Sequence, residues 1–128
     1  MTDISNRKDI ILLSEKFYQK LLSNPNINFI FTDVAKINLE SHLPKIINFW
    51  CLSMFGEPGY DTNVMHVHLE LNEKFPLQPE HFKIWLDTFF ETVDENFSGI
   101  NADSIKTRAL SVATIMQLKT NQFHKNNS

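Results

Sequence analysis

The chain has 128 residues, 42% hydrophobic and 21% charged, a size and balance that fit one globular domain with a buried core. Its formal net charge of −3 provides no basic surface, so nucleic acid is not an expected partner. The single cysteine, Cys51, excludes an internal disulfide and favours a reducing compartment. The first residues show no basic region followed by a long apolar stretch. The sequence therefore predicts a cytoplasmic protein with no membrane association.

The first predicted helix runs from Arg7 to Ser23, where apolar residues recur at the helical period. One stripe consists of Ile10, Leu13, Phe17 and Leu21. Pro25 ends the helix, because proline disfavours helical backbone in the residue before it. Residues 33–41 give an ambiguous pattern that we interpret as partly helical.

A second helix is predicted from Ser41 to Phe55, with Pro44 in its first turn, where the missing N–H costs little. One line along this helix consists of His42, Ile46, Phe49 and Ser53. Glycine and proline in residues 56–59 predict a turn after it.

A shorter helix is predicted over residues 62–71, and it carries two histidines. Because His66 and His68 are two residues apart, they point to nearly opposite sides of a helix. His68 shares its side with apolar residues, whereas His66 lies among polar ones. His68 is therefore either a core histidine bonded to a carbonyl or a ligand to a metal. The sequence has no H-E-x-x-H or C-x-x-C pattern, so a zinc site is not indicated.

The clearest helix has Pro79 in its first turn and a wide apolar face that must be buried. That face consists of Phe82, Trp85, Leu86, Phe89, Phe90, Val93 and Phe97. A last helix follows, with Asn101 or Asp103 as its expected cap. Its apolar face consists of Ile105, Ala109, Val112 and Met116. We expect disorder in the polar tail 120–128 and an all-α fold with a single domain over residues 1–128.

Five blocks of sequence, in order, resemble the truncated haemoglobins of the third subgroup. They are Phe17-Tyr18-Gln19-Lys20, HLPKIINFW, FGEPGY, HLEL around His68, and PEHFKIWLDTFFETVDENFSG. The blocks match in spacing from residue 10 to residue 118, which is most of the chain. The paired glycines usual in the other two truncated subgroups are missing, as expected for the third.

The resemblance implies a truncated globin fold, a two-over-two helical sandwich enclosing haem b. No C-x-x-C-H is present, so covalent attachment of the haem is not expected. His68 matches the proximal ligand that binds the iron, in agreement with its apolar side of the helix. His66 is the alternative ligand if the helix is shifted in register.

On the other side of the haem, the resemblance implies that Tyr18, His42 and Trp85 surround the ligand. Each of the three is otherwise explained by core packing. For Tyr18 and Trp85, a hydroxyl and an indole N–H are donors suited to a bound oxygen that carries negative charge. The residues expected to contact the haem itself are Phe31, Lys45, Ile46 and Phe49, with Lys45 a candidate partner of a propionate.

Three functions are compatible with such a site. The first is binding of oxygen or another diatomic ligand such as nitric oxide. The second is enzymatic, as a nitric oxide dioxygenase or a peroxidase, and it requires a separate reductase. The third is a sensor or an interaction module that kept the helices without the haem. One haem site supports several chemistries, so the sequence leaves open whether the protein is an enzyme.

Overall fold

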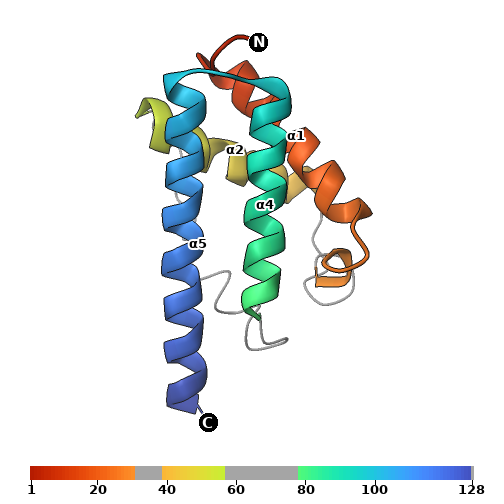
Figure 1. Cartoon of the computed structure of the whole chain (residues 1–128), viewed down its shortest axis with the longest axis vertical. Helices are drawn as coiled ribbons and strands as arrows, with labels where there is room; N and C mark the ends of the chain where they lie inside the picture. The colour runs from red at the N-terminus through yellow and green to blue at the C-terminus, as the bar shows by residue number, and fades with distance from the viewer. Residues whose placement is uncertain (31–38, 57–77, 128) are drawn as a thin grey trace.

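The computed structural model describes residues 1–30, 39–56 and 78–127, and all regular structure within these ranges is helical. The helices are α1 (Arg7–Ser23), α2 (Leu39–Phe55), α4 (Pro79–Asn96) and α5 (Ile100–Asn127). Helices α4 and α5 lie side by side in opposite directions, and α1 and α2 cross against them (Figure 1). Helix α1 packs on both α2 and α4 and so connects the two pairs. The predicted all-α class is confirmed, while the predicted helix 62–71 lies outside the described residues.

Helix α1 begins and ends where the sequence predicted. Asn6 caps its start by accepting a hydrogen bond from the amide of Asp9, at 3.2 Å. All four residues of the predicted apolar stripe are buried, namely Ile10, Leu13, Phe17 and Leu21. Tyr18, next to that stripe, is also buried, which places its ring inside the bundle rather than at the surface.

Helix α2 begins two residues earlier than predicted, so Pro44 lies in its second turn instead of its first. A proline at that position cannot make the helical hydrogen bond to the carbonyl of Glu40, since it has no N–H. The residues of α2 buried most deeply are Ile47, Trp50 and Cys51. The predicted line through Ile46 and Phe49 is only half-buried, because the helix turns an adjacent face to the core.

Helix α4 starts at Pro79, as predicted, and its apolar face packs between α1 and α5. Phe89 is 1% exposed and Val93 is fully buried, so the centre of this helix is in the core. Phe90, also expected in the core, is half-buried instead and has the Lys106 ammonium 5.9 Å from the centre of its ring. On α5, the buried positions are Ala102, Ile105, Ala109, Ala113 and Met116.

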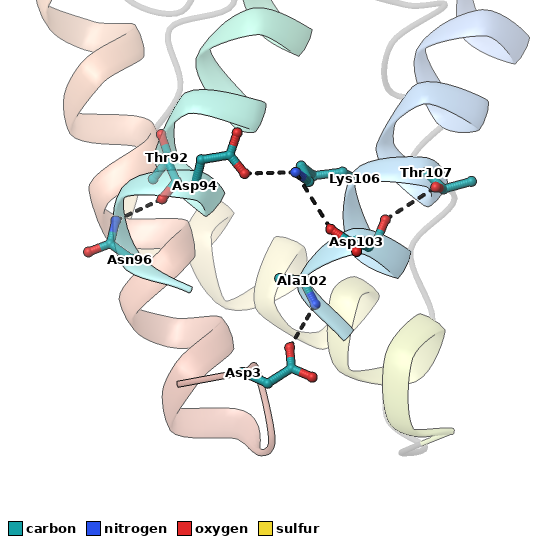
Figure 2. Close-up of polar contacts among 8 residues, drawn as sticks. All are labelled: Asp3, Thr92, Asp94, Asn96, Ala102, Asp103, Lys106 and Thr107. Carbon is teal, nitrogen blue, oxygen red and sulfur yellow. Dashed lines mark hydrogen bonds and ion pairs between the residues drawn. The ribbon is translucent and has the colours of Figure 1, made fainter. Parts of the chain in front are cut away.

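The first residues of the chain cap α5, a role that the sequence assigned to Asn101 or Asp103. The Asp3 carboxylate accepts hydrogen bonds from the amides of Asn101 and Ala102, at 2.9 and 2.8 Å. Figure 2 shows Asp3 reaching Ala102, with Lys106 paired to Asp94 at 2.7 Å close by. Because α5 already starts at Ile100, Asn101 and Asp103 lie within its first turn and cannot be its cap.

Helix α5 continues to Asn127, so the backbone of residues 120–127 is helical where the sequence predicted disorder. The extension is continuous with the buried part of the helix and runs past the start of α4, since the two helices are antiparallel (Figure 1). Among the described helices, none combines the length and the apolar character that crossing a bilayer requires.

Candidate functional site

Tyr18 and His42, which the sequence placed at the ligand, meet between α1 and α2. The Tyr18 hydroxyl lies 2.9 Å from Nε2 of His42, within hydrogen-bond distance, and the two rings meet edge to face. Tyr18 is 5% exposed, and this burial raises the pKa of its phenol well above the ordinary value. The hydroxyl therefore keeps its proton at physiological pH and remains a hydrogen-bond donor.

Trp85, the third predicted ligand-binding residue, joins this pair through Phe17. The Phe17 ring meets the Tyr18 ring at 5.4 Å and the Trp85 ring at 5.6 Å, in both cases edge to face. Trp85 is also stacked on Phe89 at 5.8 Å. We call Tyr18, His42 and Trp85 the distal cluster, after the role that the sequence predicts for them. Three different helices supply its members, so its geometry depends on how those helices pack.

The aromatic rings behind the distal cluster hold α1, α2 and α4 together. Phe89 of α4 lies at their centre, with Phe17 at 5.1 Å and Trp50 at 5.2 Å. Edge-to-face and offset stacking each contribute about 0.5–1.5 kcal/mol beyond the burial of apolar area. This packing fixes the helix positions on which the Tyr18 and Trp85 side chains depend.

The predicted haem contacts fall into three groups. Ile46 and Phe49 are half-buried on α2, with the Phe49 ring 5.0 Å from that of Trp50. Lys45 is exposed on the same helix. Phe31 and the predicted iron ligand His68 lie outside the described residues. The structure therefore shows where Tyr18, His42 and Trp85 lie, and the roles of all these residues toward haem stay predictions.

The residues present fit a flat apolar group that carries a polar centre. Apolar side chains beside the distal cluster stay partly exposed although they pack on the core, which leaves apolar surface available. These side chains are Leu43, Ile46 and Phe49. The buried Tyr18 hydroxyl and the His42 ring provide polar groups at one point of this surface. Such a surface suits haem, which is apolar across its plane and polar where a ligand binds.

The sequence analysis missed His81, which is buried at the start of α4. Its Nδ1 accepts a hydrogen bond from the amide of Gln78, at 3.0 Å. Its ring meets that of Phe29 edge to face, at 6.2 Å. The signal was available in the sequence: His81 is three residues beyond the helix cap, where a glutamate or glutamine usually reaches back to that amide.

Comparison with known proteins agrees with this architecture. The sequence is 30% identical over 115 residues to the group 3 truncated haemoglobin of Campylobacter jejuni subsp. jejuni (serotype O:2), covering 88% of each chain. The structure superposes on the crystal structure of the group III truncated haemoglobin from Campylobacter jejuni with a TM-score of 0.82. That match covers 94% of this chain and 95% of the other, at 27% identity. No family model matches the sequence.

The fold and these likenesses define a haem-binding globin with the truncated two-over-two helical sandwich. The pairs α1–α2 and α4–α5 are its two layers. More narrowly, the chain belongs to the group III truncated haemoglobins. The fold class and the family that the sequence blocks predicted are both confirmed.

Proposed function

We propose that this protein binds haem b through His68 and holds oxygen, or another diatomic ligand such as nitric oxide, against the distal cluster. The hydrogen bond between Tyr18 and His42 carries the proposal, since it places a buried, protonated phenol beside a second polar ring. Trp85 supplies an indole N–H from a third helix. The bound haem would supply the iron at which the ligand binds.

The distal cluster acts by donating hydrogen bonds. Tyr18 can exchange its hydrogen bond with His42 for one to a ligand that carries negative charge. A hydrogen bond to a charged group contributes about 1.5–3 kcal/mol, compared with about 1 kcal/mol for a neutral pair. The exchange therefore favours ligands that develop negative charge, such as oxygen.

The iron ligand is tested by replacing His68 with glycine. We expect His68→Gly to lose haem during purification and to regain it when imidazole is added, because free imidazole can occupy the place of the deleted ring. The absorption spectrum reports haem content, and His66→Gly is the matched control that should keep its haem. Full haem occupancy in His68→Gly, or loss in His66→Gly instead, would assign the iron ligand to His66.

A second function, as a nitric oxide dioxygenase or a peroxidase, is favoured by the same Tyr18–His42 pair. A buried phenol that keeps its proton can donate a hydrogen bond to a bound ligand whose oxygen–oxygen bond is cleaved, and the adjacent imidazole is a second group that can donate or accept a proton. Turnover requires a separate reductase as electron donor. Catalytic turnover of nitric oxide to nitrate with a reductase present supports this function, whereas a single equivalent supports binding alone.

The proposed location is the cytoplasm. Cys51, the single cysteine of the sequence, is fully buried, and a chain without an internal disulfide is usual in a reducing compartment.

A further inference from the structure

His81 lies one helical turn before Trp85 on the same side of α4. It is 7% exposed, although histidines at the start of a helix can usually reach water. Its Nδ1 accepts the hydrogen bond from the Gln78 amide, so in the neutral ring the proton is on Nε2. The hydrogen bond from this backbone amide thus helps to fix the orientation of the imidazole.

Gln78 and His81 hold the first turn of α4 through reciprocal hydrogen bonds, in which the Gln78 side chain accepts from the His81 amide and the His81 ring accepts from the Gln78 amide. Pro79 has no N–H, and the Phe82 amide reaches the Gln78 carbonyl only at 3.5 Å. The His81 amide also donates to the Gln78 carbonyl, at 2.9 Å. His81 therefore bonds Gln78 twice, once through its backbone and once through its ring.

The position of Trp85 depends on this turn. In an α-helix each amide bonds the carbonyl four residues earlier, which for Trp85 is the carbonyl of His81. If the first turn frays, the Trp85 amide loses that partner and its backbone gains freedom. The indole also packs against Phe17 and Phe89. These contacts require the Trp85 backbone to be in its helical position.

We propose that His81 is a positioning residue for Trp85, and that its Nδ1, by capping the first turn of α4, holds the indole in the distal cluster. The edge-to-face contact with Phe29 keeps the His81 ring in the orientation that the cap requires. This inference rests on the proposed function in one respect, namely that the Trp85 indole contacts the ligand.

Two variants of His81 distinguish the effect of its hydrogen-bond acceptor from the effect of its aromatic ring. His81→Phe keeps an aromatic ring against Phe29 but removes the acceptor, whereas His81→Gln loses the ring but keeps an acceptor suited to this cap. Loss of a helix cap changes the equilibrium between ordered and frayed turn by about five-fold. We therefore expect amide exchange at Trp85 to be about five-fold faster in His81→Phe and near wild type in His81→Gln.

The haem-bound protein supplies a second readout. The oxygen dissociation rate should rise about two- to five-fold in His81→Phe and return towards wild type in His81→Gln. Asp3→Ala is the control, because it removes the cap of α5 at the far end of the bundle. It should lower the unfolding temperature without changing oxygen dissociation or Trp85 exchange.

Three results would overturn the proposal. They are wild-type exchange at Trp85 in His81→Phe, a His81→Gln variant as impaired as His81→Phe, and an Asp3→Ala control with the same changes. Amide exchange requires no ligand, so it decides the role of His81 even if the protein binds no oxygen. Absence of oxygen binding in the wild type would instead refute the proposed function.

Discussion

Replacing Tyr18 with phenylalanine removes one hydroxyl from the distal cluster and leaves the ring that packs against Phe17. The hydroxyl is buried and lies 2.9 Å from His42 Nε2, so in the ligand-free protein it already has a hydrogen-bond partner. The change in oxygen affinity is therefore the difference between two hydrogen bonds, and is smaller than the value of the bond to the ligand.

The bond to a negatively charged ligand contributes about 1.5–3 kcal/mol and the neutral bond to His42 about 1 kcal/mol. Their difference, about 0.5–2 kcal/mol, corresponds to a change of about 2- to 30-fold in the dissociation constant. Most of this change should be in the dissociation rate, as is usual among variants of one site. We expect Tyr18→Phe to bind oxygen more weakly by this factor.

The assay is oxygen release from the reduced, haem-bound protein after flash photolysis or stopped-flow mixing. Carbon monoxide is the control ligand, because it develops much less negative charge and should respond less to loss of the donor. The reasoning is refuted if Tyr18→Phe binds oxygen as tightly as wild type. It is also refuted if carbon monoxide and oxygen are affected equally, since a repacked core would act on both ligands.

Three further predictions concern the stability of the bundle. At Gly99, φ is +143° and an added Cβ would lie 2.5 Å from Cγ of Asp3, so Gly99→Ala should lower the free energy of unfolding in urea by about 1–3 kcal/mol. Hydrogen bonds from backbone amides, above all that of Asn101, lower the pKa of the Asp3 carboxyl. The charged carboxylate therefore stabilises the fold at pH values above the ordinary aspartate pKa. This stabilisation is lost as the pH falls through the lower pKa of the folded state. Asp3→Asn should therefore show a smaller fall in unfolding temperature than wild type on acidification below about pH 4, and an identical fall would contradict the role of the charge. The Ser14 hydroxyl is buried with no protein partner among the described residues, so Ser14→Ala should keep or raise the free energy of unfolding, by up to about 1 kcal/mol, and a clear loss would mean that the hydroxyl is hydrogen-bonded.

The helix boundaries that the sequence predicted best are those marked by a local signal. Pro25 after α1 and Pro79 at the start of α4 limit the backbone directly, and the structure has helix boundaries at both places. The apolar period of α1 likewise identified its buried face. Such features depend only on neighbouring residues, so they can be predicted from sequence.

The cap of α5 was not predicted correctly, and the core-facing side of α2 could not be read from its pattern, because each depends on distant residues. Ile47 and Trp50 face the core and Ile46 is half-buried, as a result of how α2 lies against α1. Asp3 caps a helix that begins about a hundred residues later. Neither feature can be predicted from neighbouring residues. Asn101 and Asp103 seemed suitable as caps only because they are close in sequence to the start of α5.

For the site, the sequence blocks brought Tyr18, His42 and Trp85 together through the family resemblance, and the structure places Tyr18 and His42 in contact. Their roles toward a ligand stay predictions. Periodicity alone marked Tyr18 and Trp85 as core residues, because a buried donor and a buried packing residue have the same spacing. His81 was missed because an imidazole is not among the usual side chains of a helix cap.

The contact between Asp3 and the start of α5 spans 98 to 99 residues. During synthesis the N-terminal segment leaves the ribosome first, whereas the turn that it must meet is made about a hundred residues later. Closing so long a loop is entropically costly and slows folding. Ile4, fully buried beside this contact, would stay solvated until then. The nascent globin is therefore expected to complete its bundle late, at the step in which the N-terminal segment meets the start of α5.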